Sequence, residues 1–312
     1  MDIDYLLFLQ DFRNGINDAL TPFMEFISLF AVSLLVCFPI LMYWMVNKRD
    51  GLYMLASYAL TMGINSIVKL TVCAYRPWIR DERIRPAGDA ITTATGYSFP
   101  SGHTVSAGSI CGSLAITAWK KMKWVSVLCL ILFLLTAFSR NYLGVHTPQD
   151  VIAASLESIL CLFLIARLFR YLQVHPDKEN LFLAISFFFG WAAIAYITFK
   201  PYPMTFVDGE LLVDPQKMMT DGYGDIALLI AFPIARFIER KWIGFKTAGS
   251  SGKGIAVCAI GLVPIPLMML FLHIPLDAAL GSHWGHFAYS VILVMYIIAL
   301  YPLVIKKVCG GS

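Results

Sequence analysis

The 312-residue chain is 58% hydrophobic and only 14% charged, with a formal net charge of +4. Ordinary soluble domains carry about 25% charged residues, so this composition excludes a water-soluble globule and predicts a protein that meets lipid over most of its surface. The expected partners are membrane lipids and a substrate, with no nucleic acid. The seven cysteines include no Cys-x-x-Cys pair, and neither a zinc site nor a disulfide framework is predicted.

The first 22 residues are expected to form a short helix at the membrane surface. Residues 4–20 alternate leucine and phenylalanine with polar residues at near-helical spacing, which is typical of an interfacial helix. Asp2, Asp4 and Asp11 stand where a cleavable signal peptide would need basic residues. No such peptide is therefore predicted.

Nine stretches of the chain have the apolar character of a membrane-spanning helix, which needs about 20 mainly apolar residues. They lie at 23–46, 52–73, 103–119, 124–139, 148–171, 181–199, 224–240, 254–273 and 285–305. The third and fourth are short and are joined only by Lys120–Lys123, which predicts a tight helical hairpin. The predicted fold class is all-α, a polytopic membrane protein with about nine transmembrane helices.

The domain organisation follows from these spans. Residues 23–171 are predicted to form a membrane core that carries the functional site, because they contain the polar motifs described below. Residues 172–309 add further spans and an outer loop at 201–222, which is polar and interrupted by proline and glycine. Residues 310–312, Gly-Gly-Ser, are expected to be a remnant of cloning.

The distribution of lysine and arginine predicts the orientation. With nine spans, thirteen basic residues fall in loops on one side and eight on the other. Five of those eight are Arg76, Arg80, Arg83, Arg85 and Arg140, which surround the candidate site. Because basic loops stay in the cytoplasm, the C-terminus is predicted inside and the N-terminus outside.

Three polar clusters stand at the ends of predicted spans, all on the outer side. They are Lys69–Pro77 at the end of the second span, Pro100–His103 at the start of the third, and Ser139–Asp150 between the fourth and fifth. Cations converging at a membrane edge are costly unless an anion joins them. The three clusters therefore predict one site for an anionic group.

The residue types in these clusters suit a phosphoryl group. Arginine's planar fork matches phosphate oxygens two at a time, so Arg76 and Arg140, with Lys69, form a candidate phosphate-binding set. Ser101 and Gly102 precede the third span, where backbone N–H groups at a helix N-terminus favour anions. No metal or other cofactor is predicted.

Two histidines complete the candidate site. His146 and Asp150 are four residues apart, so they share a face if the fifth helix begins early enough. A carboxylate on one imidazole nitrogen leaves the other free to attack phosphorus, which makes His146 the candidate nucleophile and Asp150 the residue that orients it. His103 is the candidate general acid and base, which protonates the leaving oxygen and then activates water.

These motifs closely resemble the signature of the type 2 phosphatidic acid phosphatase superfamily, which includes lipid phosphate phosphatases, glucose-6-phosphatase and undecaprenyl-diphosphate phosphatases. Every signature position is present: Lys69, Arg76 and Pro77; Pro100, Ser101, Gly102 and His103; Ser139, Arg140, His146 and Asp150. The resemblance covers about residues 52–170. It implies a helical core and hydrolysis through a phosphohistidine intermediate.

The predicted function is hydrolysis of a lipid phosphate or diphosphate at the outer face, such as phosphatidate, phosphatidylglycerophosphate, a sphingoid-base phosphate or an isoprenoid diphosphate. Three alternatives remain: a phosphatase of a small soluble phosphate similar to glucose-6-phosphatase, a lipid phosphotransferase that uses the same intermediate, and a lipid-binding or transport protein without activity. The expected location is a multi-pass membrane protein with its active site on the periplasmic, extracellular or lumenal side, and a bacterial plasma membrane is favoured.

Overall fold

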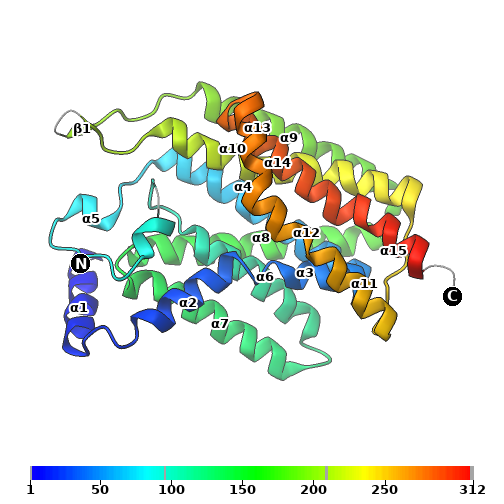
Figure 1. Ribbon diagram of the computed structural model, residues 1–312, viewed down its shortest axis with the longest axis horizontal. Coiled ribbons are helices and arrows are strands. Elements are labelled where there is room, and N and C mark those ends of the chain that lie inside the picture. The colour runs from blue at the N-terminus through cyan, green and yellow to red at the C-terminus, as the bar shows by residue number, and fades with distance from the viewer. Residues whose placement is uncertain (1, 95, 208–209, 310–312) are drawn as a thin grey trace. The chain divides into compact units, whose positions relative to one another are not determined.

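The computed structural model describes residues 2–94, 96–207 and 210–309. Regular structure in these ranges is helical except for two short antiparallel strands, β1 (Phe206–Val207) and β2 (Glu210–Leu211). The predicted all-α class is therefore confirmed (Figure 1). The expected cloning remnant at 310–312 lies outside the described residues.

The helices follow one another closely along the chain (Figure 1). The α-helices are α1 Asp2–Gly15, α2 Thr21–Val32, α3 Cys37–Leu41, α4 Lys48–Val72, α5 Pro77–Arg80, α6 Gly102–Ala118, α7 Lys123–Tyr142, α8 Pro148–Val174, α9 Glu179–Phe199, α10 Pro215–Ile238, α11 Gly252–Leu262, α12 Pro264–Leu267, α13 His273–Leu280, α14 Ser282–Met295 and α15 Tyr301–Cys309. Short 3-10 or π-helical segments are η1 Met42–Val46, η2 Ala90–Thr93, η3 Pro176–Lys178, η4 Glu239–Ile243, η5 Met268–Leu272 and η6 Tyr296–Leu300.

Seven helical segments in the described part of the chain are long and apolar enough to cross a membrane. They are Thr21–Val46, Lys48–Arg80, Lys123–Tyr142, Pro148–Val174, Pro176–Phe199, Gly252–Leu280 and Ser282–Cys309. Helices also occupy the other two predicted positions, but α6 has only 17 residues and α10 contains Asp221, Asp225 and Arg236. The count of nine and the orientation of the termini remain predictions.

The outer loop is shorter than the predicted 201–222, because α10 begins at Pro215. Proline suits the first turn of a helix, since it has no N–H group to leave unpaired. Asp214 precedes it, and its Oδ1 accepts a hydrogen bond from the Gln216 N–H at 2.9 Å. This carboxylate starts the helix within a stretch whose composition resembles a loop.

The chain divides into two compact units, each assembled from separate stretches. Unit 1 comprises residues 1–36, 65–162 and 200–218, and unit 2 comprises residues 37–64, 163–199 and 219–312. The predicted division at residues 22 and 171 stays a prediction. All residues of the candidate site belong to unit 1.

In unit 1, α6 packs along α7, and α2 contacts both helices. Two glycines four residues apart, Gly108 and Gly112, let α8 approach α6 closely. A Cβ at Gly108 would lie 2.6 Å from the Ser158 Oγ, and one at Gly112 would lie 2.4 Å from a Leu162 methyl carbon. Small residues at this spacing allow close packing of membrane helices. This packing holds the start of α6 beside α8, on which Asp150 stands.

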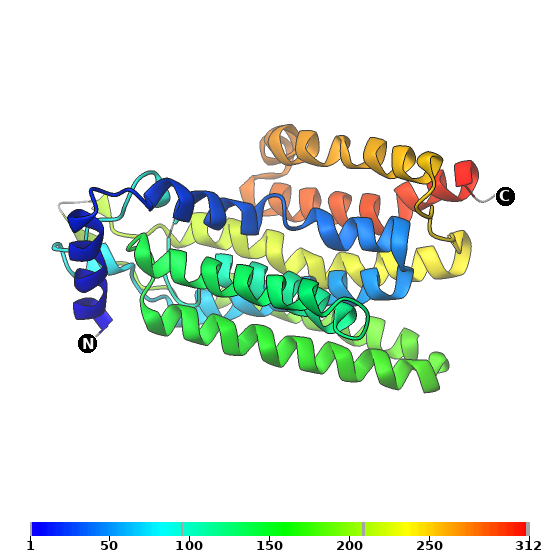
Figure 2. The same cartoon turned by 90° about the horizontal axis from the view of Figure 1, so that it is seen from below.

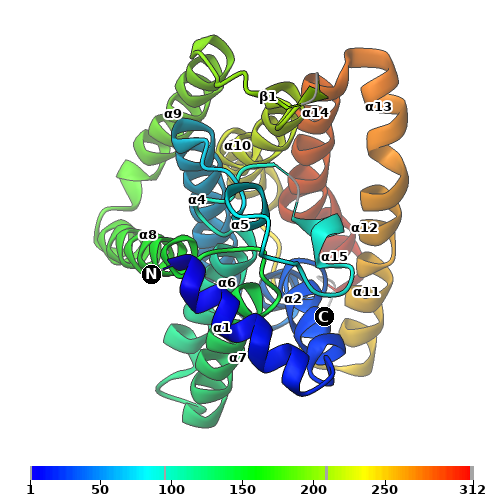
Figure 3. The same cartoon turned by 90° about the vertical axis from the view of Figure 1, so that its left-hand side faces the viewer.

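Helix α1 contacts α7 (Figure 3). Its Arg13 is buried, and the guanidinium donates to the Arg85 carbonyl at 2.8 Å and to the Tyr142 carbonyl at 3.3 Å. A helix is thus present within the first 22 residues, but it ends at Gly15, before the predicted end, and it is held to the loops beside the candidate site. Its place at a membrane surface remains a prediction.

In unit 2, α11 and α13 pack beside α15 and α14, respectively (Figure 2). Buried aromatic residues fix the N-terminal part of this unit against η6. The Trp44 indole N–H donates to the Ile297 carbonyl at 2.8 Å, and the Tyr43 hydroxyl donates to the Ile298 carbonyl at 3.0 Å. Buried tyrosine and tryptophan need such polar partners, which here are carbonyls of a π-helical segment.

Candidate active site

The three sequence motifs occupy adjoining ends of helices in unit 1. Lys69 lies in the last turn of α4, and Arg76 is the residue before α5. Ser101 caps the N-terminus of α6, while Arg140 lies in the last turn of α7. His146 stands in the short turn that leads to α8. The predicted site residues therefore come from the ends of five helices, α4 to α8, and from the connections next to them.

His146 is almost fully buried and contacts both a cation and a carboxylate. An Nη1 hydrogen of Arg76 points to His146 Nε2 at 2.8 Å. On the other side of the ring, Nδ1 lies 3.4 Å from Asp150 Oδ2. Because arginine can only donate, Nε2 must be the acceptor, so the proton of the neutral ring is on Nδ1 and faces Asp150. This arrangement places the lone pair on Nε2.

Asp150 is held by three donors that converge on one oxygen. Its Oδ2 accepts the Ser98 hydroxyl at 2.6 Å and the Thr147 N–H at 2.8 Å, in addition to facing His146. The Asp150 N–H in turn donates to the Thr147 hydroxyl at 3.3 Å. These bonds hold the buried carboxylate in place, so it can fix the imidazole tautomer.

The three predicted phosphate-binding cations have different partners. Arg76 is buried and donates to the Gly96 carbonyl at 3.1 Å and to the Val145 carbonyl at 3.0 Å. Lys69 is half-buried and donates to the Pro100 carbonyl at 2.6 Å. Backbone carbonyls thus help to position both cations.

Arg140 is 1% exposed, and its Nη1 donates to the Ser28 hydroxyl. Among the described residues, its Nε and Nη2 are buried without a hydrogen-bond partner, and so is Nε2 of His103. Leaving a buried donor unpaired costs about 1–3 kcal/mol, and more when the group is charged. These three atoms therefore have the hydrogen-bonding capacity to hold an anionic ligand.

His103 lies in the first turn of α6, within electrostatic range of Arg140, His146, Arg76 and Lys69. The structure thus brings together both histidines and all three cations.

The backbone of the second motif differs in part from the prediction. Ser101 and Gly102 were both expected to offer N–H groups to an anion. The Ser101 N–H instead donates to the Asp150 carbonyl at 3.1 Å. This bond joins the second motif to α8. The Ser101 hydroxyl accepts from the Thr104 N–H at 3.4 Å, as a helix cap does. Gly102 and His103 supply the remaining N–H groups of the first turn, which have no intrahelical acceptor.

Burial and nearby positive charge both act on His146. Desolvation in the interior of the unit, and then the charges of Arg76, Arg140 and Lys69, hold the pKa of His146 well below its ordinary range. Each of these effects disfavours the protonated ring. The imidazole is therefore neutral at pH 7, as a nucleophile must be.

Sequence reasoning missed several residues that support the site. Ser98 binds Asp150, Asn141 donates to the His146 carbonyl at 2.8 Å, and Ser28 binds Arg140. Ser98 and Asn141 lie close to motif residues in the chain, but serine and asparagine are common in loops and mark no chemistry alone. Ser28 is 112 residues from Arg140, so nothing in its sequence context indicates the contact.

Within the described ranges, no three histidine, cysteine, aspartate or glutamate side chains gather as a metal site would require. The acidic side chain of the candidate site, Asp150, is already held by Ser98, Thr147 and His146.

Comparison with known proteins gives one family and three relatives. Residues 50–173 match the model of the PAP2 superfamily. The chain is 29% identical over 145 residues to phosphatidylglycerophosphatase B of Bacillus subtilis, a match that covers 44% of the chain and 67% of the relative. It is 29% identical over 107 residues to undecaprenyl-diphosphatase of Sulfolobus acidocaldarius, covering 34% of the chain and 49% of the relative.

Lipid phosphate phosphatase delta of Arabidopsis thaliana is 25% identical over 213 residues, covering 64% of the chain and 49% of the relative. The chain thus spans about half the length of the second and third of these relatives. No solved structure gives a significant match. The resemblance predicted from the three motifs is confirmed by the family match, which contains all of them.

Proposed function

Residues 50–173 match the PAP2 superfamily, and from this match we propose that the protein hydrolyses a lipid phosphate or diphosphate through a phosphohistidine on His146. The observation that carries the proposal is the paired geometry of His146, with Arg76 at Nε2 and Asp150 beside Nδ1. It supports a neutral nucleophile whose lone pair points toward the cations that would bind the phosphoryl group.

Binding is the first step. Oxygens of the phosphoryl group would take up the unpaired donors of Arg140, while Lys69 and Arg76 neutralise its remaining charge. Arg76 would exchange its bond to His146 Nε2 for a phosphate oxygen, which frees the lone pair. The negative charge of the ligand also favours the protonated form of His103.

The first chemical step forms the Nε2–phosphorus bond and breaks the bond from phosphorus to the leaving oxygen. His103 gives its proton to that oxygen, so the alcohol or lipid monophosphate leaves as a neutral hydroxyl or a less charged group. Asp150 stabilises the positive charge that develops on the His146 ring. The cations hold the charge on the three other phosphoryl oxygens.

The second step returns the enzyme to its starting state. Neutral His103 takes a proton from water as the water oxygen attacks phosphorus, and the phosphorus–Nε2 bond breaks. Inorganic phosphate leaves, and His146 regains its neutral form. No step in this sequence uses a group from outside the chain other than substrate and water.

A lipid substrate is favoured by the surroundings of the site. The protein is a multi-pass membrane protein, and motif residues lie at the ends of α4, α7 and α8, all of which are in candidate spans. A phosphate at a lipid headgroup would reach such a position from the bilayer. The names of the three relatives, each a lipid phosphatase or diphosphatase, support the same substrate class. We place the reaction on the extracytoplasmic side, on the basis of the lysine and arginine distribution.

The test is phosphate release by the purified protein in detergent with EDTA, on phosphatidate, phosphatidylglycerophosphate, an isoprenoid diphosphate and glucose 6-phosphate. Release from one of the lipids should persist in EDTA and fall by about 10⁴-fold or more in His146→Ala. His286→Ala, a histidine of unit 2 beside Asp277, is the matched control and should retain full activity.

Acid-sensitive, base-stable ³²P on the wild type, absent from His146→Ala, should identify the intermediate. More than a tenth of the activity remaining in His146→Ala would place the nucleophile elsewhere. A preference for glucose 6-phosphate would replace the lipid with a soluble substrate, and transfer of the label to an added alcohol in place of water would make the enzyme a phosphotransferase.

A further inference from the structure

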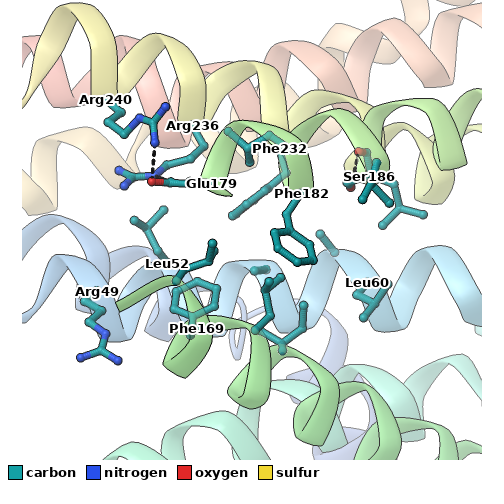
Figure 4. A pocket seen from close by; sticks show the side chains of 18 of the residues that line it. Arg49, Leu52, Leu60, Phe169, Glu179, Phe182, Ser186, Phe232, Arg236 and Arg240 are labelled. Carbon is teal, nitrogen blue, oxygen red and sulfur yellow. Dashed lines mark hydrogen bonds and ion pairs between the residues drawn. The ribbon is translucent and has the colours of Figure 1, made fainter. Parts of the chain in front are cut away.

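Unit 2 contains a large cavity that shares no residue with the candidate active site. Its volume is about 820 Å³, and it lies between α4, α8, α9 and α10 (Figure 4). Ligand-binding cavities in proteins range from about 300 to 1,000 Å³. The cavity is therefore large enough for a sizeable organic ligand.

The walls of the cavity are mainly aliphatic and aromatic. Figure 4 shows Leu52 and Leu60 of α4, Phe169 of α8, Phe182 of α9 and Phe232 of α10 around the same space. Such walls suit hydrocarbon, because each buried methylene contributes about 0.8 kcal/mol. A polar ligand would leave most of its hydrogen bonds unmade here.

The cavity is open between α8 and α9, where some of its lining residues are exposed. Leu164 of α8 and Ile185 and Phe189 of α9 line it and are 49%, 54% and 43% exposed. Both helices are candidate membrane spans, so these exposed apolar residues are expected to face lipid. A lipid chain can therefore enter sideways, without crossing water.

One end of the cavity is strongly basic. Lys48, Arg49, Arg236 and Arg240 line it, together with a single acidic residue, Glu179. Glu179 pairs with Arg236 at 2.8 Å and with Arg240 at 2.6 Å (Figure 4). Glu239, which is fully buried, also pairs with Lys48 at 2.5 Å and with Arg236 at 2.6 Å. Four cations therefore share two carboxylates, and Arg49 is exposed. This end has an excess of positive charge next to an apolar chamber.

From the apolar chamber, its side opening and its basic end, we propose that unit 2 binds one anionic membrane lipid, with acyl chains in the cavity and a phosphate headgroup at Arg49 and Arg240. The headgroup oxygens would accept hydrogen bonds from both guanidinium groups. Lys48, Arg49 and Arg240 also belong to loops predicted to be cytoplasmic, where anionic lipid creates a negative surface potential.

The positive charge at one end distinguishes this cavity from a gap between helices that binds lipid without specificity. Such a gap fills with whichever lipid is abundant, and a neutral headgroup would satisfy it equally well. The four basic residues at this end outnumber the two carboxylates that pair with them, and this excess favours an anionic headgroup, because each unneutralised Lys or Arg near a membrane surface contributes about 1 kcal/mol toward anionic lipid. The bound lipid is a ligand and not a substrate, since none of the candidate catalytic residues lines the cavity.

The first test compares phosphatidylglycerol with phosphatidylcholine, added in detergent to the purified full chain and counted by native mass spectrometry. Phosphatidylglycerol is a phosphodiester, so a phosphomonoesterase does not consume it. One tightly bound phosphatidylglycerol should be seen, with at least about tenfold weaker binding of phosphatidylcholine. Equal binding of the two lipids would overturn the proposed headgroup site.

Two pairs of variants locate the lipid. Ala56→Phe fills the chamber from α4 and should abolish binding, whereas Ala192→Phe on the exposed side of α9 should not change it. Arg49→Gln should weaken binding at least about tenfold. Its control Lys241→Gln removes one charge from the same predicted side without lining the cavity, and should leave binding unchanged.

A third measurement needs no substitution and so does not depend on a variant folding. Phosphatidylglycerol with a photoreactive acyl chain should label peptides that contain Phe169, Phe182 and Phe232. Labelling confined to other helices, or undiminished binding to Ala56→Phe, would show that the cavity is not the site. His146→Ala should bind phosphatidylglycerol like the wild type, so failure of the proposed catalysis leaves this inference standing.

Discussion

Each unit contains a histidine beside an aspartate, and the two pairs differ mainly in what surrounds them. His146 Nδ1 lies 3.4 Å from Asp150 with both side chains almost fully buried, while His286 Nδ1 lies 3.2 Å from Asp277 with 30% and 26% exposure. The first ring also contacts Arg76, and the second lies beside the His273 ring. The distances are similar, so geometry within the pair does not distinguish a catalytic histidine.

The cations and the burial make the difference. Around His146, Arg76, Arg140 and Lys69 keep the ring neutral and would bind the group it attacks. A partly exposed pair such as His286–Asp277 is screened by solvent and contributes little beyond local structure. Each pair consists of one histidine and one aspartate, so residue types alone do not show which histidine belongs to an active site. The spacing of the cations around His146 carries the functional information.

The strongest test of this contrast removes the carboxylate from each pair. Asp150→Asn should lower kcat/KM by about 10³–10⁴-fold, because the amide can turn its N–H toward Nδ1 and force the wrong tautomer, an effect of about 10⁴ in a serine protease triad. Asp277→Asn should leave the rate unchanged. Steady-state assays of phosphate release measure both, and equal losses would remove the distinction between the two pairs.

Arginine geometry gives the next effect. Arg140→Lys keeps the charge but loses the planar fork, so kcat/KM should fall by about 10–100-fold and vanadate should inhibit more weakly. Arg170→Lys in unit 2, whose guanidinium donates to the Ala166 carbonyl, is the control. Vanadate inhibition curves and substrate kinetics would check this. Unchanged vanadate affinity in Arg140→Lys would mean that Arg140 does not bind the phosphoryl group.

Ser98 should have a smaller role. Ser98→Ala removes one of the hydrogen-bond donors to Asp150, and such a bond to a charged group contributes about 1.5–3 kcal/mol. The Thr147 N–H would still bind the same oxygen and limit the loss. We expect about a tenfold loss in kcat and little change in KM. Ser106→Ala, another buried serine of unit 1 that donates to the Ala31 carbonyl, tests for general packing effects. The double variant Ser98→Ala with Asp150→Asn should lose little more than Asp150→Asn alone, because Ser98 acts mainly through this carboxylate and its direct contact with His146 Nδ1, at 3.4 Å, is weaker.

The smallest expected effect is a shift in pH dependence. Since the folded pKa of His146 is lowered, the acid limb of kcat/KM should lie below the ordinary value of about 6.5. Removing a nearby cation with Lys69→Met should move this limb to higher pH. Both enzymes act on the same substrate, so its own titration cancels in the comparison. An unchanged or lower limb would show that Lys69 does not act on His146.

The same shift has a consequence for stability. Below pH 6.5 the unfolded chain takes up a proton on this histidine that the folded chain excludes. Stability associated with neutral His146 is therefore complete above about pH 6.5 and is lost as pH falls toward the lowered folded pKa. Thermal unfolding of the wild type should become more sensitive to acid in this range than that of His146→Ala, although other carboxylates titrate at lower pH in both.

The helices and the three family motifs could be predicted from sequence because each has a local pattern. Apolar runs predict the spans, and Lys69, Arg76, His146 and Asp150 stand at spacings that place them at helix ends. Contacts between distant segments could not be predicted: Ser28 with Arg140, and Arg13 with Arg85. The hydrogen bond from the Ser101 N–H to the Asp150 carbonyl could not be predicted either, because it depends on how α6 and α8 pack.

If His146 is the nucleophile, as proposed above, the hydrogen bond from Arg76 to its Nε2 limits which molecules it can attack. As long as that bond is present, the lone pair is directed at a proton and not at an incoming electrophile. Only a ligand able to draw the guanidinium away, as phosphate oxygens do, makes the nitrogen reactive. Acylating or alkylating metabolites without such oxygens should therefore modify His146 slowly, and bound vanadate or phosphate would loosen this protection even while occupying the phosphoryl position. Selectivity for phosphate esters would then arise from one arginine, which first blocks the lone pair of His146 and then binds the phosphate of the substrate.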